Sequence, residues 1–363
     1  MDPQTRLRLT TNPGLEDLVL RELRARVGPG VEAHGDLTTP SGRVEVTLPM
    51  DRSDALAAAR ALSSVHHVLR PIARLELEDG ADRDGALRAV RGAVAAQDIP
   101  ELEAAATFRA SSRRRGTHPF SSEDVARFAG AGALDRYPHL AVDLEGYAVN
   151  LRADLRDRTL DLAIQHTHRA LSKRRAGPYR PRVALKAPVA WALLQLAAEA
   201  LGRPPRLLLD PCCGSATLLR EAGALWPDCA LRGSDAFEKP LAGAQSNIDA
   251  LGLAPRTELR HVDFRALRAG WPELGPDNLD LIVANPPYGR RLGARTDLYA
   301  LYRGLLLEAA EMLAPGRRLV LLATARERLN RAIKHTPAWH TVGVRVVETG
   351  GIWPLVVVLE RRA

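Results

Sequence analysis

Apolar and polar residues alternate in short segments near the start of the chain, and helical patterns separate these segments. Residues 6–10 and 43–48 alternate as half-buried strands do, whereas the apolar residues at 15, 18, 19 and 23 have the spacing of one helix face. Residues 53–62 predict a second helix with Ser53 as its N-cap. The order strand, helix, strand, helix predicts a small α+β unit over residues 1–75.

A second α+β unit is predicted over residues 76–165. We expect helices at 87–96 and 121–133, and the second of these opens with a Ser-Ser-Glu-Asp sequence typical of a capping box. Strands are expected at 106–111, 139–144, 147–151 and 159–165, with a turn at Glu145 and Gly146 between the middle two. Residues 163–182 then contain six basic residues and no acidic one, together with a glycine and two prolines. We therefore expect an exposed basic linker over residues 166–182.

The pattern changes in the last half of the chain, over residues 183–363. Strongly apolar, β-rich runs there alternate with helices. The predicted strands are 206–210, 230–235, 257–263, 279–284, 318–324, 341–348 and 355–360. This alternation predicts an α/β domain with a mostly parallel seven-stranded sheet that is covered by helices on both faces.

Length and composition exclude several classes of protein. The 363 residues fit two or three domains at roughly 150 residues each. Three cysteines, two of them adjacent, cannot build a disulfide framework, and no Cys/His spacing predicts a metal site. The longest charge-free apolar stretch, residues 187–198, is shorter than the roughly 20 residues that a membrane helix needs. The N-terminal residues do not have the pattern of a secretory signal, so we expect a cytoplasmic protein without a membrane anchor.

The positive charge is unevenly distributed. The whole chain carries +8, but residues 1–100 carry −2, whereas residues 101–182 and 183–363 carry +5 each. The middle third is therefore the better candidate for a nucleic-acid surface. Arginine enrichment along the whole chain explains part of this charge without any ligand.

The first loop with candidate chemistry is the segment 210–217, Asp-Pro-Cys-Cys-Gly-Ser-Ala-Thr, which follows an apolar strand and opens a helix. A glycine turn at such a junction lets a ligand approach the backbone amides at the helix N-terminus. Neither a GxGxxG nor a GxxxxGK[ST] pattern is present, so phosphate binding is not expected. By itself, the loop is also consistent with a plain strand-to-helix turn.

The second and third candidates also lie at predicted strand ends. Asp235 follows the glycine loop by 20–25 residues, where a carboxylate accepts hydrogen bonds from ribose hydroxyls, and Asp263 ends the next strand. The segment 285–289, Asn-Pro-Pro-Tyr-Gly, follows the apolar strand 279–284. Its two prolines fix the backbone and remove two donors, which leaves an amide side chain, carbonyls and an aromatic ring at the sheet edge.

Together these segments resemble class I S-adenosylmethionine-dependent methyltransferases that act on an exocyclic base nitrogen. Three segments are similar in sequence to the corresponding segments of THUMP-domain RNA guanosine N2-methyltransferases, namely HRALSKRRAGPYRPR, DPCCGSATLLREA and NPPYGRRLG. TTNPGLEDLVLRELRAR resembles the ferredoxin-like leader of that family, and TFRASSRRRGTHPF resembles its THUMP domain. The resemblance implies a ferredoxin-like domain over 1–75, a THUMP RNA-binding domain over 76–165, and a Rossmann-like methyltransferase domain over 183–363.

The resemblance also implies site residues. Cofactor binding, with S-adenosylhomocysteine as the product, is expected at Asp210, Cys213, Gly214, Ser215, Ala216, Thr217, Asp235, Ala236, Phe237, Asp263, Phe264 and Asn285. Substrate contacts are expected at Asn285, Pro286, Pro287 and Tyr288, with Asn285 and the Pro286 carbonyl accepting from the guanine amine and Tyr288 stacking on the base. RNA binding is expected at Arg109, Arg113, Arg114, Arg115, Lys173, Arg174 and Arg175. The family usually has glycine at position 216, and we expect the Ala216 methyl to crowd the cofactor.

The implied substrate is guanosine 6 in the acceptor stem of tRNA, with the tRNA held by its 3′ CCA end and the enzyme acting as a monomer. A guanosine of 23S rRNA is an alternative substrate within the same family. Two other interpretations stay open on the sequence. NPPY also occurs in DNA adenine and protein glutamine methyltransferases, and Ala216 is compatible with a non-catalytic RNA-binding or assembly factor that has a decayed cofactor pocket.

Overall fold

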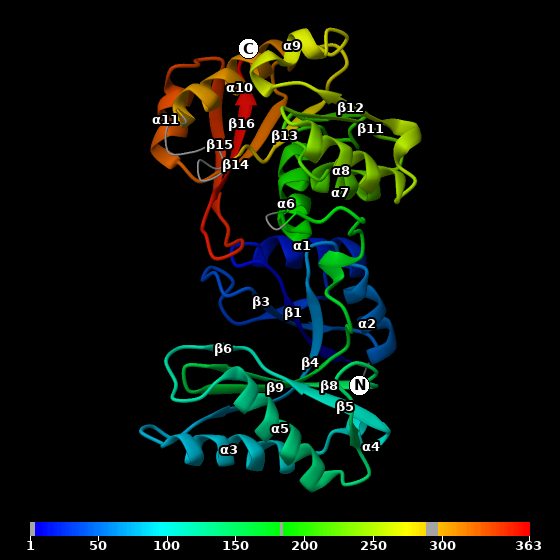
Figure 1. Cartoon of the computed structure of the whole chain (residues 1–363), viewed down its shortest axis with the longest axis vertical. Helices are drawn as coiled ribbons and strands as arrows, with labels where there is room; N and C mark the ends of the chain where they lie inside the picture. Colours follow the sequence, from blue (N-terminus) through cyan, green and yellow to red (C-terminus); the bar gives the residue numbers. More distant parts are fainter. Residues whose placement is uncertain (1–3, 182–183, 288–296) are drawn as a thin grey trace.

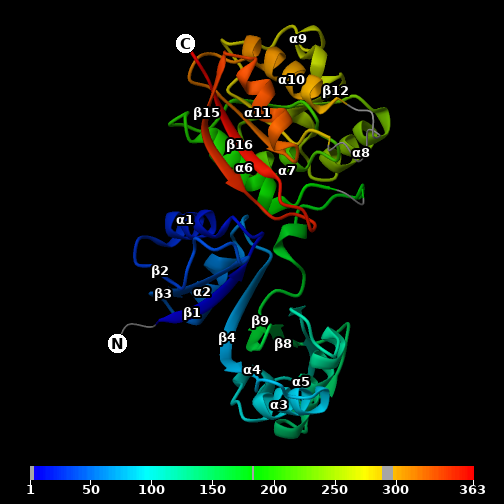
Figure 2. The same cartoon turned by 90° about the vertical axis from the view of Figure 1, so that its left-hand side faces the viewer.

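Two β-sheets organise the chain, and they belong to three parts that are stacked along its longest axis (Figures 1 and 2). The computed structural model describes residues 4–181, 184–287 and 297–363. The predicted methyltransferase domain, which we call the catalytic domain, lies at one end of the stack, residues 4–60 lie in the middle, and the predicted THUMP domain lies at the other end. Among the described residues, no helix has the length and the apolar character needed to span a membrane.

The first sheet runs through both N-terminal units. Its order is β2-β3-β1-β4-β9-β8-β5-β7, with the short β6 beside β8. The strands are β1 (Thr5–Thr10), β2 (Glu32–His34), β3 (Arg43–Leu48), β4 (His67–Glu76), β5 (Thr107–Ser111), β6 (Arg114–Arg115), β7 (Ala141–Val142), β8 (Val149–Arg156) and β9 (Thr159–Gln165). The helices are α1 (Glu16–Val27), α2 (Arg52–Arg60), α3 (Arg83–Ala95), α4 (Pro100–Glu103) and α5 (Ser122–Arg136).

Strand β4 joins the two units, and the sequence pattern did not predict it. Its first residues pair with β1, and its length from Leu69 to Glu76 pairs antiparallel with β9. The register shifts between Pro71 and Ala73, at a proline that has no N–H for the ladder. Because this one strand belongs to both units, the predicted boundary after residue 75 falls near the end of a shared strand, inside a continuous sheet.

The turn predicted at Glu145 and Gly146 lies between two strands, β7 and β8, which do not pair with each other because both pair parallel with β5, on its opposite edges. The predicted N-cap of the second helix was wrong. Helix α2 is capped by Asp51, which accepts from the Asp54 N–H, while Ser53 lies inside its first turn. The predicted start of α5 is confirmed, since Ser121 and Asp124 form a reciprocal capping box.

The second sheet has the predicted seven strands within the described residues, in the order β12-β11-β10-β13-β14-β16-β15. All neighbours pair parallel except β16, which is antiparallel to β14 and β15. The strands are β10 (Leu207–Asp210), β11 (Ala230–Asp235), β12 (Thr257–His261), β13 (Leu281–Ala284), β14 (Arg318–Ala323), β15 (Trp339–Val346) and β16 (Leu355–Arg361). The helices are α6 (Ala187–Ala198), α7 (Thr217–Leu225), α8 (Glu238–Asp249), α9 (Leu267–Gly270), α10 (Leu298–Met312) and α11 (Arg326–Lys334).

Alternate residues of these strands enter two separate cores, one on each face of the sheet. Leu208 packs with α6 and α7, whereas its neighbour Leu209 packs with α10. The strand order reverses at β10, which lies between β11 and β13. The loops after these strands therefore surround the crevice where α/β sheets of this type bind ligands.

Helix α1 of the first unit packs directly on the catalytic domain. Its leading residues Leu15 and Leu18 are buried in the same core as Trp191 and Val347. Arg345 donates to both carboxylate oxygens of Asp17, over distances of 2.6 and 2.7 Å. This contact makes the middle unit a support for the catalytic domain.

A buried ion-pair cluster lies on the face of the first sheet that α3 and α5 leave open. Asp161 on β9 is 1% exposed and pairs with Arg8 on β1 at 2.9 Å and with Arg74 on β4 at 2.8 Å. Arg43 on β3 also pairs with it. Burial alone would raise the pKa of Asp161, but hydrogen bonding from Arg74 and the charges of Arg8 and Arg43 lower it below its usual value. The carboxylate therefore compensates several cations across three strands.

Replacing Asp161 with alanine should destabilise the N-terminal unit by roughly 1–3 kcal/mol, since the buried Arg8 loses one of its two carboxylate partners and retains only Glu45. All five tryptophans lie between residues 191 and 353. The urea concentration at the unfolding midpoint should therefore decrease when unfolding is followed by circular dichroism, and it should decrease less when unfolding is followed by tryptophan fluorescence. Asp135→Ala, which removes only a surface pair with Arg91, is the matched control and should change neither transition appreciably. Equal effects of the two substitutions would contradict the role of Asp161.

Candidate active site and nucleic-acid interface

A cavity of about 470 Å³ lies where the strand order of the catalytic sheet reverses. The loops after β10, β11, β12 and β13 all contribute to it. Of the residues expected to bind cofactor or substrate, it is lined by Asp210, Cys213, Gly214, Ser215, Thr217, Asp235, Ala236, Phe237, Asp263, Phe264, Asn285 and Pro287. The structure therefore brings four segments, separated in sequence, to one site.

The glycine loop is held by the carboxylate at the end of the next strand. Asp235 accepts from the Gly214 N–H through one oxygen and from the Phe237 N–H through the other, both at 3.0 Å. Gly214 has a φ of +54°, a conformation that favours glycine. One carboxylate thus fixes two loops of the cavity.

Ala216 lies outside the cavity lining. Its side chain is fully buried in the apolar core beneath α7, and its backbone is left-handed, with φ +61° and ψ 31°. The prediction of a methyl group crowding the cofactor therefore finds no support in the geometry. A glycine would be favoured at this position because an L-residue in this conformation costs roughly 1–2 kcal/mol.

Asp210 is a buried carboxyl, and no described cation forms an ion pair with it. It is 1% exposed and accepts from the Cys212 N–H at 3.1 Å. Burial, together with the charge of the nearby Asp235 carboxylate, raises the pKa of Asp210 to about 8 against the opposing effect of that hydrogen bond. A ligand with positive charge would supply the missing compensation, and the sulfonium and ammonium groups of S-adenosylmethionine fit this requirement.

The remaining predicted residues have different surroundings. Asp263 caps the turn Phe264–Ala266, and its pKa is lowered because the Arg265 side chain hydrogen-bonds to it. Asn285 ends β13 at the cavity, and Pro286 behind it is buried. Tyr288 lies outside the described residues. Among the residues that are described, no cluster of acidic, histidine or cysteine side chains has the arrangement of a metal site.

The sequence interpretation missed a wall of the cavity. Tyr179 and Pro181, from the predicted linker, line it together with Ala184 and Leu185. The glycine and prolines around them indicated only an exposed connection. An aromatic residue in an otherwise polar and basic segment was the available signal for a buried role.

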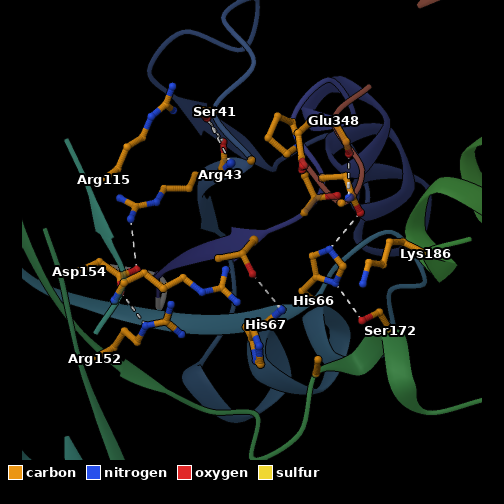
Figure 3. A pocket seen from close by; sticks show the side chains of 18 of the residues that line it. Ser41, Arg43, His66, His67, Arg115, Arg152, Asp154, Ser172, Lys186 and Glu348 are labelled. Carbon is orange, nitrogen blue, oxygen red and sulfur yellow. Dashed lines mark hydrogen bonds and ion pairs between the residues drawn. The ribbon is translucent and has the colours of Figure 1, made fainter. Parts of the chain in front are cut away.

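A second cavity, of about 990 Å³, lies where the two N-terminal units, the linker and the catalytic domain meet (Figure 3). We call it the basic cleft. It is lined by the cations Arg43, Arg113, Arg114, Arg115, Arg152, Arg156, Arg169, Lys173, Arg180 and Lys186, and by the carboxylates of Asp154 and Glu348. Burial and the charge of Arg152 lower the pKa of Arg113, and burial and Arg43 lower that of Arg156. A polyanion would relieve this repulsion between cations.

Four of the residues expected to bind RNA line this cleft, namely Arg113, Arg114, Arg115 and Lys173. The other three lie elsewhere. Arg109 packs over the Tyr147 ring at 4.5 Å, and Arg174 donates to the Leu62 carbonyl. Arg175 pairs with Glu221 on α7. The linker is therefore only partly exposed.

A chain of hydrogen bonds at the cleft joins three of the parts that form it, namely the first N-terminal unit, the linker and the catalytic domain. Asn12 donates to the Glu348 carbonyl at 2.9 Å, and its side-chain oxygen lies 3.0 Å from His66 Nε2. Burial lowers the pKa of His66 to about 4, so its ring is neutral at pH 7. This pattern places the proton on Nε2 and leaves Nδ1 to accept from Ser172 at 2.8 Å (Figure 3).

Comparisons with known proteins agree with this arrangement. A model of the UPF0020 family, described as an RMKL-like methyltransferase domain, matches residues 174–354, and a THUMP-domain model matches residues 88–165. A tRNA (guanine(6)-N2)-methyltransferase of Thermus thermophilus is 40% identical over 360 residues, which is 98% of this chain and 99% of that protein. A protein of the same description from Archaeoglobus fulgidus is 26% identical and covers 94% of this chain and 89% of its own length.

Solved structures give the same picture. TrmN from Thermus thermophilus superimposes with a TM-score of 0.77 at 37% identity, covering 98% of this chain and 99% of that one. SMU.472, solved in complex with SAH, reaches a TM-score of 0.76 at 16% identity over the full length of both chains and shares the fold. The family resemblance and the α/β fold class predicted from the motifs are confirmed.

We expect cofactor binding to release a proton near pH 7. The Asp210 carboxyl is mainly protonated there, because its pKa is about 8, and a bound cation favours the carboxylate. S-adenosylmethionine affinity should therefore rise as the pH increases toward 8. Calorimetry at pH 7 in two buffers of different ionisation enthalpy measures the proton count. Asp210→Asn should abolish the release, while the exposed Asp228→Asn should preserve it. Unchanged proton release in the Asp210 variant would refute the assignment.

Proposed function

Because the chain belongs to the family of THUMP-domain RNA guanine-N2 methyltransferases, we propose that it transfers a methyl group from S-adenosylmethionine to the N2 amine of guanosine 6 in the tRNA acceptor stem. The activity named for the Thermus relative supports this choice of nucleotide. The observation that carries the proposal is the single cavity in which Asn285 and Pro287 meet the glycine loop and Asp235. Such a cavity brings a base amine to a methyl donor.

We assign different parts of the cofactor to different residues of the cavity. We assign its methionine part to the loop from Asp210 to Thr217 and its ribose to Asp235. Its adenine then lies against Ala236, Phe237, Asp263 and Phe264. Phe237 is 58% exposed and lies at the rim, so its ring is available for stacking. Bound there, the cofactor supplies an electrophilic methyl group on a sulfonium.

Asn285 and the Pro286 carbonyl orient the acceptor amine. The lone pair of a guanine amine is delocalised into the ring and is a poor nucleophile. Two acceptors that take its hydrogens favour tetrahedral geometry and direct the lone pair toward the methyl group. Once the amine has taken up the methyl group that the bound cofactor would supply, leaving S-adenosylhomocysteine, its extra proton would pass to solvent. Catalysis then consists mainly of positioning and electrostatic stabilisation.

The substrate base must leave its helix to reach this cavity. A paired guanine in a stem does not expose its amine to so narrow a site, so we propose base flipping. Tyr288 is our candidate for the stacking surface, although it lies outside the described residues.

We propose that the basic cleft binds the tRNA at a point distant from the reacting base. Its cations are suited to the phosphates of a single-stranded 3′ end, which includes CCA. All parts that form the cleft and the cavity belong to one chain, which supports action as a monomer. The proposed substrate further implies a cytoplasmic location.

Substitution of Asn285 by alanine should lower methyl transfer by a factor on the order of 100 or more and leave S-adenosylmethionine affinity nearly unchanged, since it removes one positioned acceptor. Mass spectrometry of digested tRNA should find N2-methylguanosine at position 6 with the wild-type protein. A tRNA with adenosine at position 6 is the control and should stay unmodified. Turnover above half of the wild-type value would exclude Asn285 as the acceptor.

Replacing Arg113, Arg114 and Arg115 together with alanine should weaken tRNA binding. The slope of log affinity against log salt should flatten by roughly 0.7–0.9 for each phosphate that the variant no longer neutralises. Removal of CCA should then weaken binding strongly for wild type and little for the variant. The triple variant Arg83, Arg88 and Arg91 to alanine removes the same charge from α3 and should retain wild-type binding. Equal effects of both triple variants would mean that the cleft does not hold the RNA end.

A further inference from the structure

One short segment of the linker borders both cavities. Tyr179 and Pro181 line the cofactor cavity, whereas Arg180 between them lines the basic cleft. Successive residues therefore face two sites to which different ligands are assigned. The segment Gly177–Pro181 is a common wall of these sites.

A single buried side chain holds this wall. Asn247 on α8 is fully buried, and its amide oxygen accepts from the Tyr179 N–H at 2.9 Å. Its amide nitrogen donates to the Tyr179 carbonyl at 2.9 Å and to the Ser215 carbonyl at 3.0 Å. Both N–H groups of Asn247 are used in this way, and one of them binds the glycine loop itself. Asn247 thus fixes the wall to the loop that surrounds the cofactor.

The close approach depends on two glycines. A Cβ at Gly177 would lie 2.1 Å from the side-chain oxygen of Asn247. A Cβ at Gly243, on the same face of α8, would lie 2.1 Å from the ring of Tyr179. The helix surface therefore leaves space for the backbone and ring of Tyr179 in one arrangement.

The residues just before this segment are also joined to the glycine loop by hydrogen bonds. Arg220 donates to the Arg175 carbonyl at 2.7 Å and to the Thr217 hydroxyl at 3.0 Å. Arg180 donates to the Gly177 carbonyl at 2.9 Å, which folds the segment on itself. A displacement of Arg180 in the cleft is thereby linked, over a few bonds, to the position of Tyr179.

We propose that Asn247 is a positioning residue, that Tyr179 is a cofactor contact, and that RNA in the basic cleft and cofactor in the cavity bind cooperatively because both stabilise one arrangement of Gly177–Pro181. This inference rests on the proposed function. The coupling is reciprocal, so each ligand strengthens the binding of the other by the same factor. Binding of the substrate RNA in the cleft therefore strengthens cofactor binding through the linker.

Calorimetric titration of S-adenosylhomocysteine, with and without saturating tRNA, measures the coupling without turnover. For the wild type we expect tRNA to tighten the binding by roughly 5-fold to 20-fold, within the usual range of coupling between sites. In Asn247→Ala this ratio should fall to about 1, while tRNA affinity without cofactor stays near the wild-type value because Arg180 remains. Gln245→Ala, an exposed change on the same helix, is the control and should retain the full ratio.

A second variant covers the case in which Asn247→Ala melts below the assay temperature. Tyr179→Ala keeps the backbone bonds to Asn247 and removes only the ring, so it should weaken S-adenosylhomocysteine binding about tenfold and reduce the coupling ratio at least threefold. Tyr179→Phe separates the contribution of the hydroxyl from that of the ring.

The possible failures are distinguishable. A wild type that methylates tRNA but shows a ratio of 1 would overturn the coupling and leave the proposed function intact, as would a folded Asn247→Ala protein with the full ratio. Undiminished affinity in Tyr179→Ala would overturn the cofactor contact. A wild type that neither binds nor methylates tRNA would refute the proposed function and this inference with it.

Discussion

The packing of α1 and its preceding turn on the catalytic domain fixes the position of the basic cleft relative to the cofactor cavity. The contact is so close that a Cβ at Gly14 would lie 2.2 Å from the Val346 carbonyl oxygen, and the φ of Gly14 is +95°. Only glycine satisfies both conditions without displacement of β15. Since β4 continues the same unit into the THUMP domain, the distance between the basic cleft and the cofactor cavity is set by the packing of these units.

The two cavities differ in how their charges are balanced. In the cleft, the carboxylate of Asp154 forms ion pairs with Arg152 and Arg43. The charges of most other cations in the cleft are therefore not compensated by it, and the electrostatic potential there is positive. The cofactor cavity is lined by the acidic residues Asp210, Asp235 and Asp263 and by one described basic residue, Arg265, so its lining favours a cationic ligand. A polyanion and a cationic cofactor are therefore favoured at different places on one chain.

The sequence was most informative where a local pattern determines the structure. The seven strands of the catalytic sheet followed from apolar runs, since strands buried on both faces tolerate few polar residues, and strand ends located Asp210, Asp235 and Asn285. Strand β4 escaped prediction because Pro71 interrupts its pattern and its pairing partner β9 lies far along the chain. The parallel pairing of β7 and β8 with β5 escaped prediction for a similar reason, since a turn at Glu145 and Gly146 does not determine with which strand each neighbour pairs.

Side-chain partners were the part that sequence could not supply. Arg113 and Arg175 have the same chemistry and lie in similar basic runs, yet one faces the cleft and the other is bound to Glu221. The difference depends on tertiary neighbours that are distant in sequence. Ala216 illustrates the same limit in the backbone: its left-handed conformation, rather than the volume of its methyl group, explains why a glycine suits this position. The strain is borne by the loop that Asp235 holds, so the carboxylate assigned to the ribose also maintains the loop in its unfavourable conformation.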